Sequence, residues 1–100
     1  MRDITHDIVT AFIRGEERQI RNSYTDGRVL RLFGTTIAWR DPDGSYRVTC
    51  AGYSTRTTLE RLNGFCEILN RTRPFHIKKG QLYYCDRAIS SDEIIRVHPP

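Results

Sequence analysis

The fold is decided by residues 35–70, which read TTIAWRDPDGSYRVTCAGYSTRTTLERLNGFCEILN. The first half places β-branched and aromatic residues on both sides of Asp41-Pro42-Asp43-Gly44, a pattern typical of two antiparallel strands joined by a turn. The second half repeats apolar residues at three- and four-residue spacing, which predicts an amphipathic helix over about residues 55–70. The stripe of that helix consists of Leu59, Leu62, Phe65, Cys66 and Leu69.

The register of this hairpin follows from the length of its loop. If residues 41–44 all belong to the loop, Arg40 lies opposite Ser45, and one face gathers the pairs Trp39 with Tyr46, Ile37 with Val48 and Thr35 with Cys50. A three-residue loop would set Trp39 opposite Arg47 and mix the two faces, so we expect the four-residue loop. The opposite face then carries Ala38, Thr36, Thr49, Arg40 and Arg47.

The first forty residues predict one helix and two strands. Ile4, Ile8 and Phe12 recur at four-residue spacing between a capping Asp3 and Gly15, which predicts a helix over residues 4–15. Residues 18–25 are expected to form one strand, and Asp26-Gly27 favours a two-residue turn into a long second strand over residues 28–40. Within that long strand, Gly34 predicts a bulge.

The remaining sequence predicts the helix cap and a second hairpin. Thr57 and Glu60 fit a capping box, with Ser54 or Thr55 as the alternative cap. Residues 75–78 and 81–85 form a hairpin around Lys79-Gly80, in which Ile77 with Leu82 and Phe75 with Tyr84 point inward. Residues 90–97 fit either one more helical turn or an edge strand over residues 94–97.

These elements predict an α+β fold with the order α-β-β-β-α-β-β. An antiparallel sheet forms one layer, and two helices on one face of the sheet form the other. The 100 residues have the length of a single domain, so we expect one domain over residues 1–100.

Charge and cysteine content limit the chemistry. Sixteen basic against twelve acidic side chains give a net charge of +4, and all but two of the basic residues are arginine. Arginine favours bidentate recognition of phosphate or carboxylate, although a GC-rich genome gives the same bias. Three dispersed cysteines, Cys50, Cys66 and Cys85, form no disulfide or zinc pattern and are expected to be buried free thiols. The sequence predicts no metal, no cofactor, no signal peptide and no membrane-spanning segment.

Two candidate binding sites emerge from the pattern. If both hairpins share a sheet, its open face gathers cations and rings suited to single-stranded nucleic acid. That face would contain Arg40, Arg47, His76, Lys78 and Tyr83. The start of the second helix joins a ring, hydroxyls and a cation where backbone N–H groups favour an anion. These residues are Tyr53, Thr55, Arg56, Thr57 and Thr58. The alternatives are an ordinary solvated sheet face and a simple helix cap.

Catalysis finds little support in the sequence. His6, His76 and His98 lie in unrelated segments, and no serine occupies a nucleophile elbow. Turns and helix ends account for most of the acidic residues. We therefore favour a binding protein over an enzyme.

The middle third of the chain resembles small uncharacterised proteins of tailed bacteriophages. The resemblance rests on a Gly-aromatic-x-Thr-x-Thr-Thr element followed by Arg-Leu-Asn, here Gly52, Tyr53, Thr55, Thr57, Thr58 and residues 61–63. It implies a phage accessory or host-takeover setting without an established activity, and the free thiols favour the cytoplasm of the bacterial host. The element order α-β-β-β-α over residues 3–70 also resembles the double-stranded RNA-binding domain, but the lysine cluster of that family is absent.

These observations lead to two functional hypotheses. The first is a non-enzymatic phage-type accessory protein that binds nucleic acid through the basic sheet face or the threonine-rich start of the second helix. The second is an inhibitor of a host bacterial protein or defence complex. A small enzyme with a site assembled from scattered residues is a further alternative, and the oligomeric state is left open.

Overall fold

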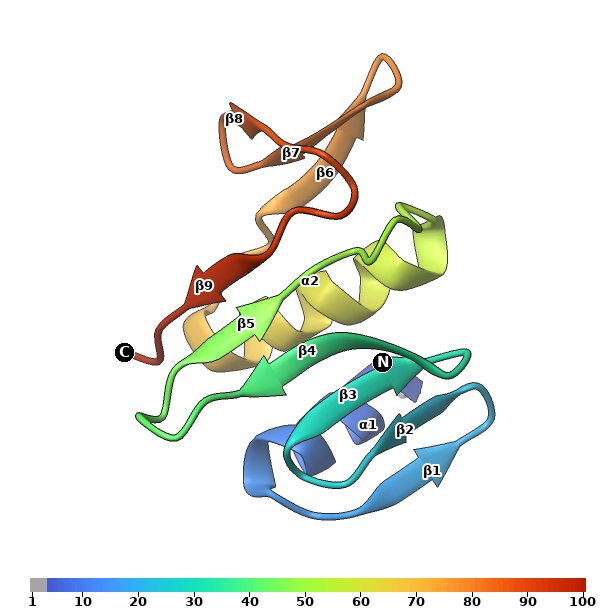
Figure 1. The fold of residues 1–100 in the computed structure, drawn as a ribbon, viewed down its shortest axis with the longest axis vertical. Coiled ribbons are helices and arrows are strands. Elements are labelled where there is room, and N and C mark those ends of the chain that lie inside the picture. The colour runs from blue at the N-terminus through green and yellow to red at the C-terminus, as the bar shows by residue number, and fades with distance from the viewer. Residues whose placement is uncertain (1–3) are drawn as a thin grey trace.

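The computed structural model describes residues 4–100, so the proposed Asp3 cap lies outside the described residues. Two helices and nine strands follow one another along the chain (Figure 1). Their bounds are α1 (Ile4–Arg14), β1 (Arg18–Ile20), β2 (Ser23–Thr25), β3 (Val29–Leu32), β4 (Thr35–Arg40), β5 (Tyr46–Val48), α2 (Arg56–Asn70), β6 (Phe75–Lys78), β7 (Gln81–Tyr84), β8 (Arg87–Ala88) and β9 (Ile95–Val97).

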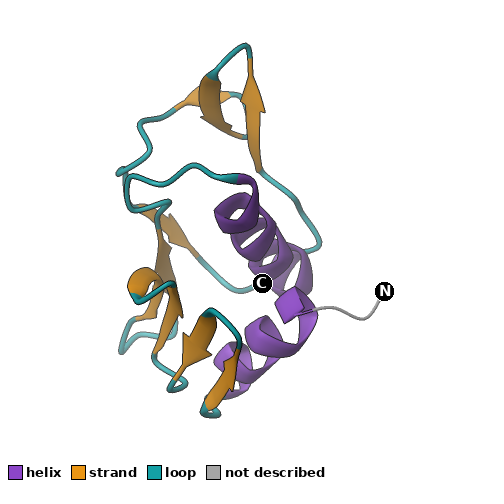
Figure 2. Cartoon of the chain, turned by 90° about the vertical axis from the view of Figure 1, so that its right-hand side faces the viewer, coloured by secondary structure: helices purple, strands orange, loops and turns teal. Residues whose placement is uncertain are grey.

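The strands form two antiparallel sheets. The large sheet has the order β1-β2-β3-β4-β5-β9, and the small sheet has the order β6-β7-β8. Both helices lie on one side of the large sheet, while the small sheet extends beyond the first turns of α2 (Figure 2). The predicted α+β class is therefore confirmed. The predicted element order is not, because five strands rather than three separate the helices.

The strand expected over residues 18–25 is two strands. β1 and β2 form a hairpin in which Ile20 pairs with Ser23, and Arg21 takes a φ of 52° in the turn between them. The two-residue turn at Asp26-Gly27 was also wrong, because Thr25 pairs with Leu30 across a wider loop. In that loop the Asp26 carboxylate accepts hydrogen bonds from the backbone N–H groups of residues 28 and 29.

The long strand expected over residues 28–40 is also divided. Leu32 pairs with Thr35, so Phe33-Gly34 is a two-residue turn, and its φ values of 53° and 78° match a type I′ hairpin. The expected bulge at Gly34 is therefore a chain reversal. A register irregularity does occur in this hairpin, but it lies between Leu30 and Arg31.

The β4–β5 hairpin adopts the register that the sequence analysis had rejected. Trp39 pairs with Arg47 and Arg40 with Tyr46, and the N–H of Asp41 donates to the carbonyl of Ser45 at 2.8 Å. Only three residues, 42–44, then remain in the loop, which the Asp43 carboxylate tightens by accepting from the N–H and hydroxyl of Ser45. The predicted pairs are consequently wrong, and Trp39, Ala38 and Arg40 lie on the faces opposite to those expected.

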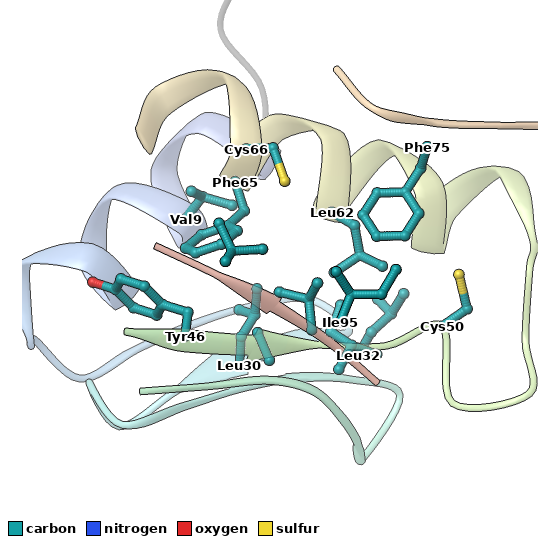
Figure 3. Close-up of a cluster of buried hydrophobic side chains, with 14 of the residues drawn as sticks. Val9, Leu30, Leu32, Tyr46, Cys50, Leu62, Phe65, Cys66, Phe75 and Ile95 are labelled. Carbon is teal, nitrogen blue, oxygen red and sulfur yellow. The ribbon is translucent and has the colours of Figure 1, made fainter. Parts of the chain in front are cut away.

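The corrected register changes which residues enter the core. Tyr46 and Val48 face the helices and are buried, as expected, and Ala38, which was expected on the opposite face, is buried with them. Trp39 lies on the opposite face and is outside the buried cluster, contrary to its expected core position. Figure 3 shows the core between the large sheet and α2, with Leu62 and Phe65 pointing from the helix toward Leu30 and Leu32.

The predicted helix stripe is confirmed. Leu62, Phe65 and Cys66 are buried, while Leu59 and Leu69 pack at the border of the core. Thr55 is the N-cap, so the capping position is the alternative one, and Arg71 ends the helix in the left-handed conformation. α1 and α2 approach closely at Gly64, where an added Cβ would lie 2.2 Å from Thr5 Cγ2.

The C-terminal third agrees with the predicted hairpin. Phe75 pairs with Tyr84 and Ile77 with Leu82 around Lys79-Gly80, as expected. β8 was not anticipated. The open question over residues 90–97 is answered by β9, which pairs with β5 at the edge of the large sheet.

Candidate functional site

The basic face expected from both hairpins does not form. β6 and β7, which carry His76, Lys78 and Tyr83, belong to the small sheet, whereas Arg40 and Arg47 belong to the large one. Within the small sheet, His76 and Tyr83 do pair and their rings stack at 5.3 Å. The expectation that one sheet would unite these five residues was therefore wrong.

Arg40 lies on the helix side of the large sheet and has a structural role. Its Nη2 donates to the carbonyl of Phe12 at 3.0 Å and to that of Ile13, the last carbonyls of α1. It also donates to the Tyr46 hydroxyl at 3.1 Å. A cation at a helix C-terminus is favourable because the helix dipole is negative there. Arg40 is thus removed from the candidate binding surface.

The outer face of the large sheet, which the helices leave uncovered, carries a different basic and aromatic set. Because paired residues of antiparallel strands point to the same face, two rows run across it. The first row is Gln19, Tyr24, Arg31 and Thr36, and the second is Val29, Trp39, Arg47 and Arg96. We call these two rows the outer face.

Each ring of the outer face lies against an arginine. The guanidinium of Arg31 is 5.9 Å from the centre of the Tyr24 ring, and that of Arg47 is 5.2 Å from Trp39. Both distances are within the range of cation–π attraction. Of these two rings and two arginines, only Arg47 was predicted as a binding residue. The expected four-residue loop had placed Trp39 on the face that packs against the helices.

Carboxylates partly neutralise the outer face. Asp41 bridges Arg47 at 3.0 Å and Arg96 at 3.0 Å. Glu17 accepts a hydrogen bond from the Tyr24 hydroxyl, and burial, this hydrogen bond and the nearby negative charge raise the pKa of that tyrosine. Arg31 is exposed, and no carboxylate within residues 4–100 forms an ion pair with it. Arg31 is therefore the arginine of this face that is available to an external anion.

At the start of α2, two of the predicted hydroxyls serve the helix itself. Thr55 Oγ1 accepts from the N–H of Thr58 at 3.3 Å and lies 3.0 Å from its hydroxyl oxygen. Arg56 is exposed, as Tyr53 is, whereas Thr57 is half-buried. The helix cap explains Thr55 and Thr58, and it leaves Arg56 and Tyr53 as the groups that a partner can reach.

A small hollow joins the start of α2 to the β3–β4 turn. It has a volume of about 280 Å³ and contains no charged residue. The exposed rings of Phe33 and Tyr53 belong to its lining. The other lining residues are Leu32, Thr35, Ile37, Cys50, Thr55 and Thr58. Phe33 and Thr35 were missed, since the sequence analysis placed them inside one continuous strand.

A larger groove, of about 740 Å³, runs along the other side of α2. The half-exposed Ile68 and Ile77 line it together with Arg56 and two ion-pairing side chains, Glu67 and Arg73. Arg56 therefore faces this groove rather than the hollow. The two parts of the predicted helix-start site consequently open onto different surfaces.

The residues Arg61, Leu62 and Asn63 of the phage-like element are structural. Arg61 is buried and donates to the hydroxyls of Ser23 at 3.0 Å and Thr5 at 2.6 Å. Leu62 lies in the core, and Asn63 binds the backbone of β6. The element thus holds the two helices and both sheets together.

The cysteines offer no activated nucleophile in the core. Burial raises the pKa of Cys50 to about 11 and that of Cys66 to about 12, so both thiols stay protonated at neutral pH. All three cysteines are free, but Cys85 is exposed, so its expected burial was wrong. No cluster of metal-ligating side chains occurs among residues 4–100. In the same part of the chain, neither helix is long and apolar enough to cross a membrane.

Comparison with known proteins gives one family match. A family model described as Kyanoviridae Gp96 protein matches residues 1–96. No curated protein and no solved structure matches the chain.

Proposed function

The chain belongs to the Kyanoviridae Gp96 protein family, and we propose that this phage protein is a non-enzymatic accessory protein that binds single-stranded nucleic acid. The binding surface in this proposal is the outer face of the large sheet. The observation that supports it most is the pairing of each ring with an arginine, Tyr24 with Arg31 and Trp39 with Arg47.

This arrangement has the two components that single-strand binding requires. Aromatic rings provide flat surfaces for bases, and arginines neutralise the phosphates between them. The rings come from β2 and β4 and the arginines from β3, β5 and β9. A nucleic-acid strand that crosses the sheet therefore meets both kinds of group in turn. An uncovered sheet face is also flat enough to accept splayed bases.

The charge of the face predicts modest, salt-dependent binding. Asp41 holds two of the three arginines, so nucleic acid has to displace or share those ion pairs. Three phosphate contacts on a single strand give a slope of log K against log salt of about −2. A protein partner of ordinary interface composition depends less on salt.

The proposal is tested with fluorescein-labelled oligonucleotides of about 12 nucleotides, within the usual site size of one small domain. Binding is followed by anisotropy between 50 and 300 mM salt, on the order of the range where counterion release is measured. Arg31→Ala is expected to weaken binding about tenfold and to reduce the salt slope by about 0.7.

Arg18→Ala is the matched control, because Arg18 is exposed on β1 but pairs with Thr25, whose side chain faces the helices. The control should leave affinity unchanged. Equal effects of the two substitutions, or no binding by the wild type at low salt, would refute the proposal.

The second candidate function is inhibition of a host bacterial protein. It is supported by the groove beside α2, where Ile68 and Ile77 present apolar surface next to Arg56. Apolar surface rimmed by charge is typical of protein contact sites. Capture of a specific protein from host lysate that survives nuclease treatment, and that Ile68→Glu abolishes, would favour this function over the first.

A further inference from the structure

We propose that the hollow between the β3–β4 turn and the start of α2 receives one unstacked base of the bound strand, held between the rings of Phe33 and Tyr53. This inference rests on the proposed function, because it needs a single strand on the outer face. It adds a base-binding position that the outer face alone does not provide.

Phe33 is the first reason. It occupies the first position of a type I′ turn with a φ of 53°, a conformation that suits asparagine or glycine and is rare for a bulky residue. Its ring is 68% exposed, so the side chain gains little from burial in the core. Folding stability therefore does not account for phenylalanine at this position, and contact with a ligand would.

Tyr53 provides the second ring. It is 60% exposed and follows a tight turn in which its N–H donates to the carbonyl of Cys50 at 2.9 Å. Both rings are therefore attached to short, hydrogen-bonded turns rather than to flexible loops. Two rings set in this way can hold a flat ring with little loss of conformational entropy.

The interior of the hollow fits a neutral heteroaromatic ring better than an ion. Its polar groups are the hydroxyls of Thr35 and Tyr53, the hydroxyls of Thr55 and Thr58 that also form the helix cap, and the thiol of Cys50, which burial keeps protonated. Hydroxyls can both donate to and accept from the edge of a base. The volume of about 280 Å³ is close to the lower end of ligand pockets, which suits a single ring.

The position of the hollow relative to the outer face is the third reason. Arg31 precedes Phe33 by two residues, which corresponds to about 7 Å along a strand. Thr36, opposite Arg31, follows Thr35 of the hollow. Leu32 and Thr35 of the hollow face the helices, whereas Arg31 faces outward, so in this proposal the nucleotide next to the phosphate on Arg31 passes around the β3–β4 turn to place its base in the hollow. Figure 1 shows this turn and the start of α2 on the same side of the molecule.

The experiment uses a thymidine oligonucleotide that contains one 2-aminopurine, whose fluorescence falls when the base is stacked. Phe33→Asn suits the backbone of the turn and removes the ring, and Tyr53→Ala removes the second ring. Each is expected to weaken binding about fivefold to 150-fold, the effect of losing one base stack, and to abolish the quenching in the bound state. Circular dichroism and thermal melting establish that both variants remain folded.

Tyr83→Ala is the matched control, since Tyr83 is an aromatic residue of the small sheet. It should change neither affinity nor quenching. Arg31→Ala should weaken binding but leave the quenching of the saturated complex unchanged. If Arg31→Ala weakens binding while Phe33→Asn and Tyr53→Ala do not, the base position is refuted and the outer-face proposal stands.

If no variant matters because the wild type binds no oligonucleotide, both proposals fail together. A third result also overturns the inference. If Phe33→Asn abolishes capture of a host protein that is resistant to nuclease, while oligonucleotide binding is unaffected, the hollow receives a protein side chain.

Discussion

Replacing Asn63 with alanine is expected to destabilise the protein by about 2–4 kcal/mol, because each buried backbone group left without a partner costs about 1–3 kcal/mol. The side-chain amide of Asn63 forms the pair of hydrogen bonds with the backbone of Phe75 that a neighbouring strand would form. Its Nδ2 donates to the carbonyl of Phe75 and its Oδ1 accepts from the N–H of Phe75, both at 2.8 Å. Phe75 is 3% exposed and Asn63 is 9% exposed, so little water reaches the two orphaned groups.

The geometry explains why no other group can substitute. Phe75 and Tyr84 are paired, and the hydrogen bond beside them runs from the N–H of Cys85 to the carbonyl of Pro74. The polar groups of Phe75 therefore point away from β7 and toward α2, in the manner of a non-hydrogen-bonded pair. Asn63 is their partner, and it fastens the small sheet to α2.

The assay is urea unfolding followed by far-ultraviolet circular dichroism and by the fluorescence of Trp39. Asn70→Ala is the control, because Asn70 lies on the same helix and its hydrogen bond to the His98 carbonyl is exposed. Both substitutions exchange asparagine for alanine on α2, and alanine favours the helix at the interior position of Asn63, so a loss of stability at Asn63 reflects the buried bonds. Asn70→Ala should change the free energy of unfolding by less than about 0.5 kcal/mol.

Asn63→Asp refines the test. At neutral pH the carboxylate still accepts from the N–H of Phe75 but repels its carbonyl, and protonation restores a donor. Part of the lost stability should therefore return on acidification, relative to wild type at the same pH. The reasoning is refuted if Asn63→Ala costs no more than Asn70→Ala.

Three further predictions concern charge and thiols. Arg61→Ala should cost at least about 1.5 kcal/mol of stability, since the buried guanidinium donates to two hydroxyls, whereas Arg56→Ala should stay within about 0.5 kcal/mol and instead weaken binding of the partner. Denaturation and binding measured on the same preparations decide between them, and the reverse pattern contradicts the assignment. A maleimide reagent should label Cys85 rapidly and the two buried thiols only in denaturant, as judged by mass spectrometry. Hydrogen bonds to the carboxylates lower the pKa of Asp26 and Asp43, so the stability they contribute is present above the ordinary aspartate value of about 3.9 and is lost as pH falls through the lowered values. Removing both carboxylates as Asp26→Asn and Asp43→Asn should make the melting temperature fall less steeply as the pH is lowered.

The parts of the fold that could be predicted are those specified by residues close together in the sequence. The stripe from Leu59 to Leu69 specifies α2 because helical periodicity requires only neighbouring residues. Lys79-Gly80 specifies the β6–β7 register in the same way. Glycine at the second position of a two-residue turn marks where the chain reverses. The Phe33-Gly34 turn has the same backbone form but was missed, because phenylalanine is not a residue that turn chemistry favours.

The candidate site depended on information that is not local. One extra backbone hydrogen bond, from Asp41 to Ser45, shifts the β4–β5 register and moves Trp39 to the outer face, opposite Arg47. The strands separate into two sheets, and Asn63 of α2 binds the backbone of β6 in the small one, which no spacing in the sequence encodes. Arg40 was predicted as an exposed cation because its partners, the last carbonyls of α1, lie far away in sequence.

The position of β9 has a consequence for how the chain folds. β1 to β5 are joined by short turns and can assemble from local contacts, but β5 reaches its second neighbour only across partners about fifty residues apart, such as Tyr46 and Val97. Closing so long a segment is slow relative to closing a hairpin. Until β9 arrives, β5 is an open sheet edge with apolar side chains beside it. During that interval we expect the nascent sheet to be open to pairing with another molecule, so slower closure should lower the protein concentration at which refolding gives way to aggregation.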